Sequence, residues 1–140
     1  MATSDFPQGP LRRAVIDRLQ SALSVPVRAQ KQAEGEEPTP PFVIVETPES
    51  EARGDIKNDT GYELTQRIRI HTRYPKGKAD LSKREEIASN VYTALENSLS
   101  VSGHNILHLP TPDVIPQTYE AGGDQAFDLL LDYELLTQTQ

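Results

Sequence analysis

Residues 62–74 read YELTQRIRIHTRY, and their polarity alternates along the chain. One side of this stretch consists of Tyr62, Leu64, Ile68, Ile70, Thr72 and Tyr74, with Gln66 as the polar exception. The other side consists of Glu63, Thr65, Arg67, Arg69, His71 and Arg73. Alternation with a period of two is typical of a β-strand that buries one face. The stretch therefore predicts a long strand with an apolar face and a basic face.

A second segment near the C-terminus, residues 125–135, alternates in the same way. Its apolar side consists of Phe127, Leu129, Leu131, Tyr133 and Leu135. The opposite side consists of Asp128, Leu130, Asp132 and Glu134. The two predicted strands thus present polar faces of opposite charge.

These opposite charges leave two interpretations open. In the first, the two strands are neighbours in one sheet, and each cross-strand charge pair contributes about 0.2–1 kcal/mol. In the second, the two faces lie on different subunits. A basic surface that meets an acidic surface elsewhere on an identical chain is a heterologous contact, which can close into a ring. The candidate subunit or partner interface consists of Arg67, Arg69, Arg73, Asp128, Asp132 and Glu134.

Two segments have helical spacing. A first helix is predicted to open at Gly9-Pro10 and to end before Val25-Pro26, because a residue that precedes proline avoids the helical region. A second helix is predicted to be capped by Asp80 or Ser82. Its apolar stripe consists of Ile87, Ala88, Val91, Tyr92, Ala94, Leu95 and Leu99.

The remaining segments complete the predicted sheet. The run FVIVE at 42–46 predicts a buried strand, 105–109 a short strand, and 113–119 an edge strand that tolerates Pro116. Residues 121–124 predict a turn. The expected fold is α+β, a mixed or antiparallel sheet with two helices packed on one face. We expect one domain over 1–140, with a flexible N-terminus at 1–9 and mobile loops at 29–41 and 47–61.

Composition and charge exclude several kinds of site and location. The 140 residues include 14 Lys and Arg, 21 Asp and Glu, and no cysteine, so the net charge is −7 and thiolate metal sites are excluded. All Lys and Arg lie at or before Arg84, which leaves residues 85–140 with acidic charge only. The first residues, MATSDFPQGPLRR, lack the apolar core of a signal sequence, and no apolar run is long enough to span a membrane. We therefore expect a soluble protein made in the cytosol.

Catalytic, metal and phosphate motifs are weak. His104 and His108 are four residues apart and His71 is a third possible ligand, but no acidic residue completes a recognisable metal pattern. Gly122-Gly123 lacks the Lys and Ser/Thr of a phosphate loop, and no serine lies in a G-x-S-x-G elbow. The carboxylates Asp128, Asp132 and Glu134 could bind a cation in a small enzyme, an alternative that we retain. The expectation is a protein without enzyme activity or cofactor.

Nucleic acid is a further candidate partner for the basic strand face. The arginines favour it, but that face carries no interleaved aromatic residues, and binding to phosphates needs a cationic surface that an acidic chain lacks overall. A small nucleic-acid-binding regulator is the alternative function from another class.

The order of features resembles the tail terminator, or tail completion, proteins of tailed bacteriophages. The resemblance covers about residues 10–137 and rests on order and spacing. It is carried by PFVIVE at 41–46, GYELTQRIRIHTRY at 61–74, and IASNVYTALENSL at 87–99 followed by SGHNIL at 102–107.

This resemblance implies a virion protein, assembled in the host cytoplasm, that forms a homohexameric ring at the head-proximal end of the tail tube. The ring ends tube polymerisation and gives the head connector a docking surface. The implied partners are further copies of the chain, the tube protein and the head-closure or connector protein. Neither a membrane nor a specific DNA sequence is implied as a partner, since the genome passes through the ring lumen. Another neck component, a head-closure or adaptor protein, is the alternative within this class.

Overall fold

The part of the chain that the structure describes forms an α+β fold of two helices and six strands. A computed structural model describes residues 8–29, 39–46, 48–52, 61–96 and 110–138. In chain order the elements are α1 (Gln8–Ala22), β1 (Val27–Ala29), β2 (Phe42–Val45), β3 (Glu49–Ala52), β4 (Gly61–Tyr74), α2 (Leu81–Leu95), β5 (Asp113–Ala121) and β6 (Asp124–Gln138).

The described strands form one mixed sheet, which is one of the two sheet types that the sequence predicts. The strand order is β1-β2-β4-β6-β5. The short strand β3 also pairs with β4 but is not part of this order. β1 and β2 are parallel, whereas all other pairs are antiparallel. The two alternating segments are the long central neighbours β4 and β6, which pair from Gly61 opposite Gln138 to Tyr74 opposite Gln125.

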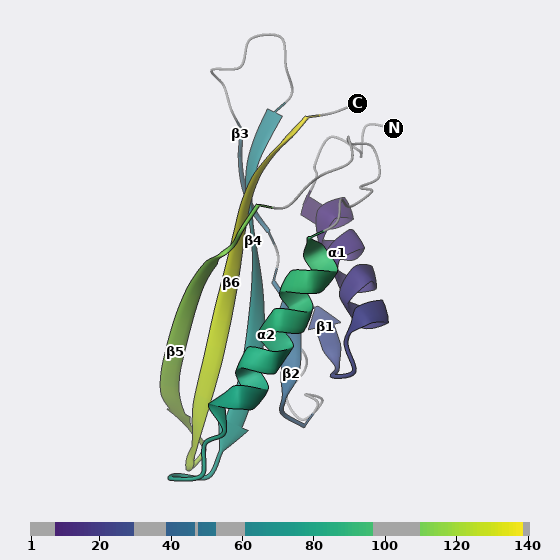
Figure 1. Ribbon diagram of the computed structural model, residues 1–140. Helices are drawn as coiled ribbons and strands as arrows, with labels where there is room; N and C mark the ends of the chain where they lie inside the picture. Colours follow the sequence, from purple (N-terminus) through teal and green to yellow (C-terminus); the bar gives the residue numbers. More distant parts are fainter. Residues whose placement is uncertain (1–7, 30–38, 47, 53–60, 97–109, 139–140) are drawn as a thin grey trace.

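Both helices lie on the same face of the sheet (Figure 1). α1 packs against β1 and β2, and α2 packs against β4 and β6. Between the layers lies one apolar core, to which both helices and the facing sides of β1, β2, β4 and β6 contribute. Burial of these side chains, at about 25 cal/mol per Å² of apolar surface, is what holds the helices on the sheet. The core residues include Leu11, Val15 and Leu19 of α1, Ile87, Val91 and Leu95 of α2, and Val43, Leu64, Ile68, Ile70, Leu131 and Tyr133 of the sheet.

The polar exception in the buried face of β4 is explained by hydrogen bonds. Gln66 is fully buried. Its side-chain amide donates to the carbonyl oxygens of Glu46, at 2.6 Å, and of Arg67, at 3.0 Å. These bonds satisfy the N–H groups of the amide and tie the residue after β2 to β4, while Oε1 has no partner among the described residues.

The hairpin between β5 and β6 follows from its two glycines. Gly122 has φ of 58° and Gly123 has φ of 91°. A two-residue hairpin turn with both φ angles positive matches the twist of the strands that it joins, and glycine adopts these angles with little strain. β5 is the sheet's edge strand, which agrees with the placement predicted from Pro116.

The structure corrects three predictions. Residues 49–52 lie within the predicted loop 47–61 but form β3, because they find an antiparallel partner in β4. α1 begins at Gln8, inside the segment 1–9 that was expected to be flexible. Tyr92, predicted to lie in the buried stripe of the second helix, is 46% exposed because α2 leaves that flank uncovered.

Other predictions lie outside the described residues. They concern the short strand at 105–109, the side chain of Leu99, His104 and His108, and most of the loop 29–41. In the described part of the chain, neither helix combines the length and the apolar character that crossing a membrane requires.

Candidate functional site

The polar sides of β4 and β6 lie together on the sheet face that carries no helix, called here the open face. Register places them there, because Ile68 pairs with Leu131 and Ile70 with Leu129 on the helix-covered side. Arg67 and its cross-strand partner Asp132 therefore point the opposite way. All six candidate interface residues belong to this open face.

Arg67 and Asp132 form a two-point ion pair. The Nε atom of Arg67 donates to Oδ1 of Asp132 at 2.8 Å, and Nη2 donates to Oδ2 at 2.9 Å. The parallel N–H groups of a guanidinium match the two oxygens of a carboxylate, which makes this the strongest common geometry for such a pair. The first interpretation of the sequence, pairing within one sheet, is confirmed here.

Asp128 lies at the centre of a second group of polar side chains. It is fully buried and receives hydrogen bonds from His71 Nδ1 at 2.7 Å, Tyr119 OH at 2.9 Å and Arg69 Nη1 at 3.0 Å. Burial by itself raises the pKa of this carboxyl group. Hydrogen bonds from His71, Arg69 and Tyr119 nevertheless hold the pKa of Asp128 below its ordinary value.

Arg69 joins Asp128 to a second acid. Its Nε donates to Oε2 of Glu46 at 2.9 Å, and its Nη1 also reaches Gln117 at 3.3 Å. Desolvation works against the charged guanidinium, but Glu46 and Asp128 raise the pKa of Arg69. The cation is thus shared between three strands, since Glu46 follows β2, Arg69 lies in β4 and Asp128 in β6.

Arg73 and Glu134 behave differently from the other four candidates. Arg73 lies opposite Ala126, and Glu134 lies opposite Thr65, so neither residue meets an opposite charge across the ladder. Both are exposed, and within the described residues neither forms an ion pair. The structure therefore joins four of the six predicted residues and leaves two at the surface.

The sequence did not identify Glu46, Tyr119 and Gln117 as members of this group. Glu46 follows Phe42 and Ile44 at alternating positions, so its side of the sheet was predictable, but its neighbour strand was not. His71 was considered as a metal ligand; in the structure its ring packs on Phe42, with centroids 4.9 Å apart, and it bonds Asp128. A register between distant segments is needed to see these contacts.

The carboxylates of the open face are poorly placed to bind a metal cation. Asp128 and Asp132 direct their carboxylate oxygens at arginine, histidine and tyrosine donors of the same chain. Among the residues that the structure describes, no group of three His, Cys, Asp or Glu side chains could hold a metal ion. What the open face can do chemically is fix the sheet and present a nearly neutral, hydrogen-bonded surface.

Comparison with known proteins adds a similarity of fold. No protein-family model and no curated protein matches the sequence. Among solved structures, the chain is similar to a chain of the virion of a native gene transfer agent particle, with a TM-score of 0.68 and 18% sequence identity. The match covers 94% of this chain and 97% of the other chain. The two chains therefore share one fold over nearly their whole lengths.

Proposed function

We propose that this chain is a structural protein of a phage-like virion, and specifically a tail terminator. In this role six copies form a ring at the head-proximal end of the tail tube. The ring stops tube polymerisation and offers the surface on which the head connector docks. The protein thus resides in the neck of the particle, and its partners are its own copies, the tube protein and the connector.

One observation carries this proposal, the fold shared with a gene transfer agent virion chain over 94% of this chain and 97% of that one. Coverage of both chains means that the whole fold is shared, with no large part of either left over. The segments that resemble tail terminators also form central elements. PFVIVE contains β2, GYELTQRIRIHTRY is β4, and the first nine residues of IASNVYTALENSL end α2.

The open face weighs against the rival functions. Nucleic acid would need free cationic groups, but Arg67 and Arg69 are neutralised by Asp132, Asp128 and Glu46. An enzyme that uses a cation would need free carboxylates, and Asp128 is fully buried beneath its donors. The same face suits a structural protein, whose sheet must hold its shape under contact with neighbours. Arg73 and Glu134 remain exposed candidates for contacts between subunits.

Assembly in the test tube separates a terminator from other proteins. The tube protein of the same particle is allowed to polymerise with and without this chain, and tube lengths are measured by negative-stain electron microscopy. We expect the chain to cap one end of each tube and to stop its growth. Tubes that grow to the same length in its presence contradict the proposal.

Position in the finished particle separates the terminator from a head-closure or adaptor protein. Antibody-labelled particles are examined by electron microscopy. A terminator is present on tails that have not yet joined a head. A head-closure or adaptor protein is present instead on filled heads that lack tails, and this result would assign the chain to the alternative neck role.

A further inference from the structure

The helix-covered face of the sheet has an uncovered margin. α2 packs over β4 and β6, and β5 extends beyond it at the edge (Figure 1). Between α2 and β5 lies a groove of about 260 Å³. Tyr92 is 46% exposed there and Val114 is 56% exposed, although both are large apolar side chains. The groove lining includes Ala88, Ser89, Tyr92, Val114, Leu129 and Leu131.

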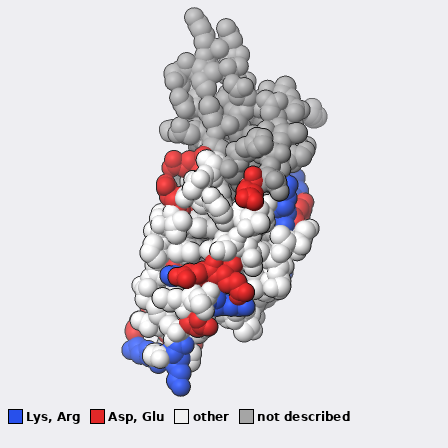
Figure 2. All heavy atoms as spheres, in the orientation of Figure 1, with Lys and Arg blue, Asp and Glu red and all other residues white. Residues whose placement is uncertain are grey.

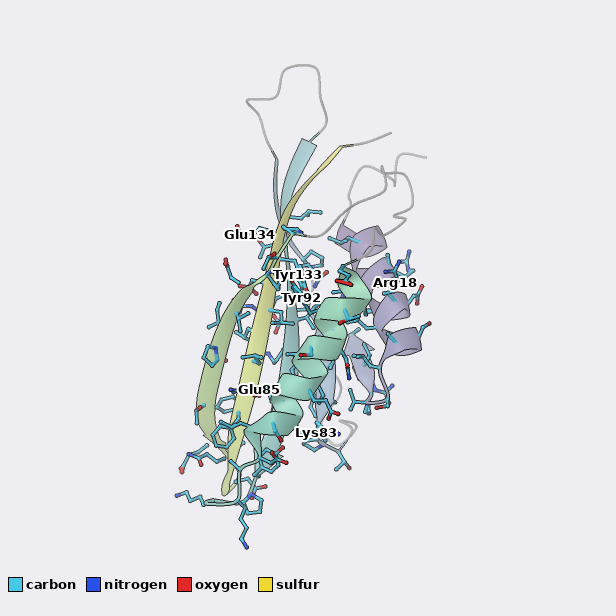
Figure 3. All side chains as sticks on the ribbon, in the orientation of Figure 1. Arg18, Lys83, Glu85, Tyr92, Tyr133 and Glu134 are labelled. Atoms are coloured by element: carbon cyan, nitrogen blue, oxygen red, sulfur yellow. The ribbon has the colours of Figure 1, made fainter. Side chains whose placement is uncertain are left out.

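The rim of this groove is acidic. Glu85 lies three and four residues before Ala88 and Ser89, so it shares their flank of α2, and Figure 3 labels it beside that helix. Glu96 follows the C-terminal end of α2 and lines an adjoining hollow of about 80 Å³. Both side chains are exposed. The chain carries no Lys or Arg after Arg84, so no cation within the later segment offsets them.

The adjoining hollow contains a polar group that needs a partner. Tyr133 lines it and is 2% exposed, and Figure 3 shows its label beside that of Tyr92. Within the described part of the chain, the Tyr133 hydroxyl group has no hydrogen-bond partner. A buried hydroxyl group without a partner is costly, so an occupant that brings a hydrogen-bond acceptor into the hollow gains from it.

A surface of complementary character lies at the N-terminal end of α2, just before Glu85. The connection between β4 and α2 and the first residues of α2 expose Lys76, Lys78, Leu81 and Lys83, called here the basic turn. Figure 2 shows Lys and Arg gathered at the lower end of the visible face, where Figure 1 places this connection. Lys76 pairs with Glu120 at 3.1 Å, and Lys83 pairs with Glu86 at 3.4 Å. All four side chains are exposed, and such surface pairs contribute little.

The basic turn cannot fill the groove of its own chain. Leu81 begins α2, and the groove starts at Ala88, about 10 Å farther along the helix. We propose that the acidic-rimmed groove receives the basic turn of a second copy, with Leu81 against the apolar lining and the lysines beside Glu85 and Glu96. The contact joins two different surfaces of one chain, which is the heterologous type that closes into rings.

This inference rests on the ring formation in the proposed function, and it names the two surfaces that form the contact between subunits. It assigns the contact to residues other than the paired charges of the open face. Arg67 and Arg69 already have partners in their own sheet, so a neighbouring subunit gains little from meeting them. The groove and the turn instead keep exposed apolar side chains and charges that are unpaired or solvated.

Single charge reversals test the contact in the full chain. Glu85→Lys alters the groove, and Lys78→Glu alters the turn. Asp17→Lys and Arg13→Glu are the matched controls, because both residues are exposed on α1, away from groove and turn. Self-association is measured by sedimentation velocity over a series of protein concentrations, and thermal unfolding checks that each variant remains folded.

We expect each of Glu85→Lys and Lys78→Glu to weaken self-association about tenfold or more, because like charges then face each other, while the controls match the wild type. Mixing the two weakened variants in equal amounts restores association. The acidic turn of one variant then meets the basic groove of the other, and six subunits can close by alternation.

Three results overturn the inference. They are a wild type that stays monomeric at every concentration, a groove variant that associates like its control, and a mixture that shows no rescue. A groove variant that self-associates normally but no longer binds the tube protein assigns the groove to that partner instead. In each case the capping assay still decides the proposed function, so the failure of one idea can be told from the failure of the other.

Discussion

At the scale of single residues, Asp128 organises the open face. A carboxylate with no exposed surface is stable only because three donors from β4 and β5 point at it. Removing one member of a buried pair leaves the others desolvated and without partners, which is costlier than the pair was worth. Tyr133 presents the reverse case, a buried hydroxyl group that lacks a partner among the described residues.

We predict that Asp128→Asn lowers the free energy of unfolding by about 3–5 kcal/mol. The amide keeps the shape of the side chain, but it removes the charge and directs N–H donors at other donors. Urea unfolding followed by circular dichroism measures the loss. Asp17→Asn, at an exposed position of α1, is the control and should stay within about 0.5 kcal/mol of the wild type.

The lowered pKa of Asp128 predicts that the chain loses stability in acid. Its folded pKa lies below the ordinary value of 3.8, so its contribution is fully present above that unfolded value. The contribution is lost as pH falls from about 4 through the folded pKa. Unfolding free energies between pH 2 and pH 7 should show this decline, and it should be shallower in Asp128→Asn. Identical slopes in the two proteins would contradict the assignment.

Tyr133→Phe should stabilise the isolated chain by about 1 kcal/mol, because the hydroxyl group is buried without a described partner. The comparison is made in dilute protein, where self-association does not contribute. Burial also raises the pKa of Tyr133 to about 12. The contribution of Tyr133 to wild-type stability is therefore fully present below pH 10 and is lost between pH 10 and 12, a decline that the phenylalanine variant should reduce. A destabilised variant would show that the hydroxyl group has a partner in the folded chain.

At the scale of elements, the β4–β6 ladder determines the rest of the sheet. Where the structure describes the side chains of both strands, it sends one row to the core and the other to the open face. The β5–β6 hairpin then brings Tyr119 and Gln117 to the same face as Asp128. Because Gln117 pairs directly with Asp128, a change at the turn that shifts this register moves Tyr119 away from its acceptor.

The hairpin glycines should respond differently to substitution. Gly123 has φ of 91°, which side chains rarely adopt, whereas Gly122 has φ of 58°, which asparagine tolerates. No atom lies within 4 Å of a Cβ added at either position, so backbone strain alone sets the cost. We predict that Gly123→Val destabilises the chain by about 1–2 kcal/mol. Gly122→Asn should be nearly neutral, and urea unfolding of both variants measures the difference.

At the scale of the whole molecule, the charge is distributed unevenly over the surface. Lys and Arg occur in the first 84 residues, and the segment after Arg84 carries the acidic excess. The open face neutralises part of both sets within the sheet. What remains exposed, at the basic turn and along the groove rim, is available to other molecules.

Self-association should therefore weaken as salt rises. The Debye length falls from about 10 Å at 0.1 M salt to about 3 Å at 1 M, which screens exposed charges but not the buried pairs of the open face. We expect the native mass to shift from a six-subunit species toward the monomer over this range while the fold is retained. Light scattering and circular dichroism on the same samples measure both quantities. An oligomer that is insensitive to salt would remove the exposed charges from the interface.

A charge reversal at Arg69 is a poor test of the subunit contact, although Arg69 belongs to the candidate interface that the sequence predicts. Arg69 bonds Asp128 and Glu46, so a carboxylate at this position would face two others inside one chain. The expected result is a damaged sheet, which would prevent assembly whatever the interface is. Arg73, which is exposed, is the better position for testing the basic face.

The sequence by itself determined the elements and their faces. Alternation marked β4 and β6, helical spacing marked α1 and α2, and the two glycines marked the hairpin, because each pattern is a local property of the backbone. The buried side of β4 was correct at Leu64, Ile68 and Ile70. The same alternation also indicated two faces of opposite charge, and it therefore predicted that the two strands could be neighbours.

Only the tertiary structure decided which charges pair. Arg67 meets Asp132 while Arg73 meets Ala126. Glu46, which follows β2, accepts from Arg69, and Tyr119 of β5 donates to Asp128. It also decided that Tyr92 lies exposed beside a groove, because α2 covers β4 and β6 and leaves β5 free. These outcomes depend on register and packing between segments far apart in the chain. Local periodicity does not determine these pairings, because it fixes the face on which a side chain lies but not the neighbour that it meets there.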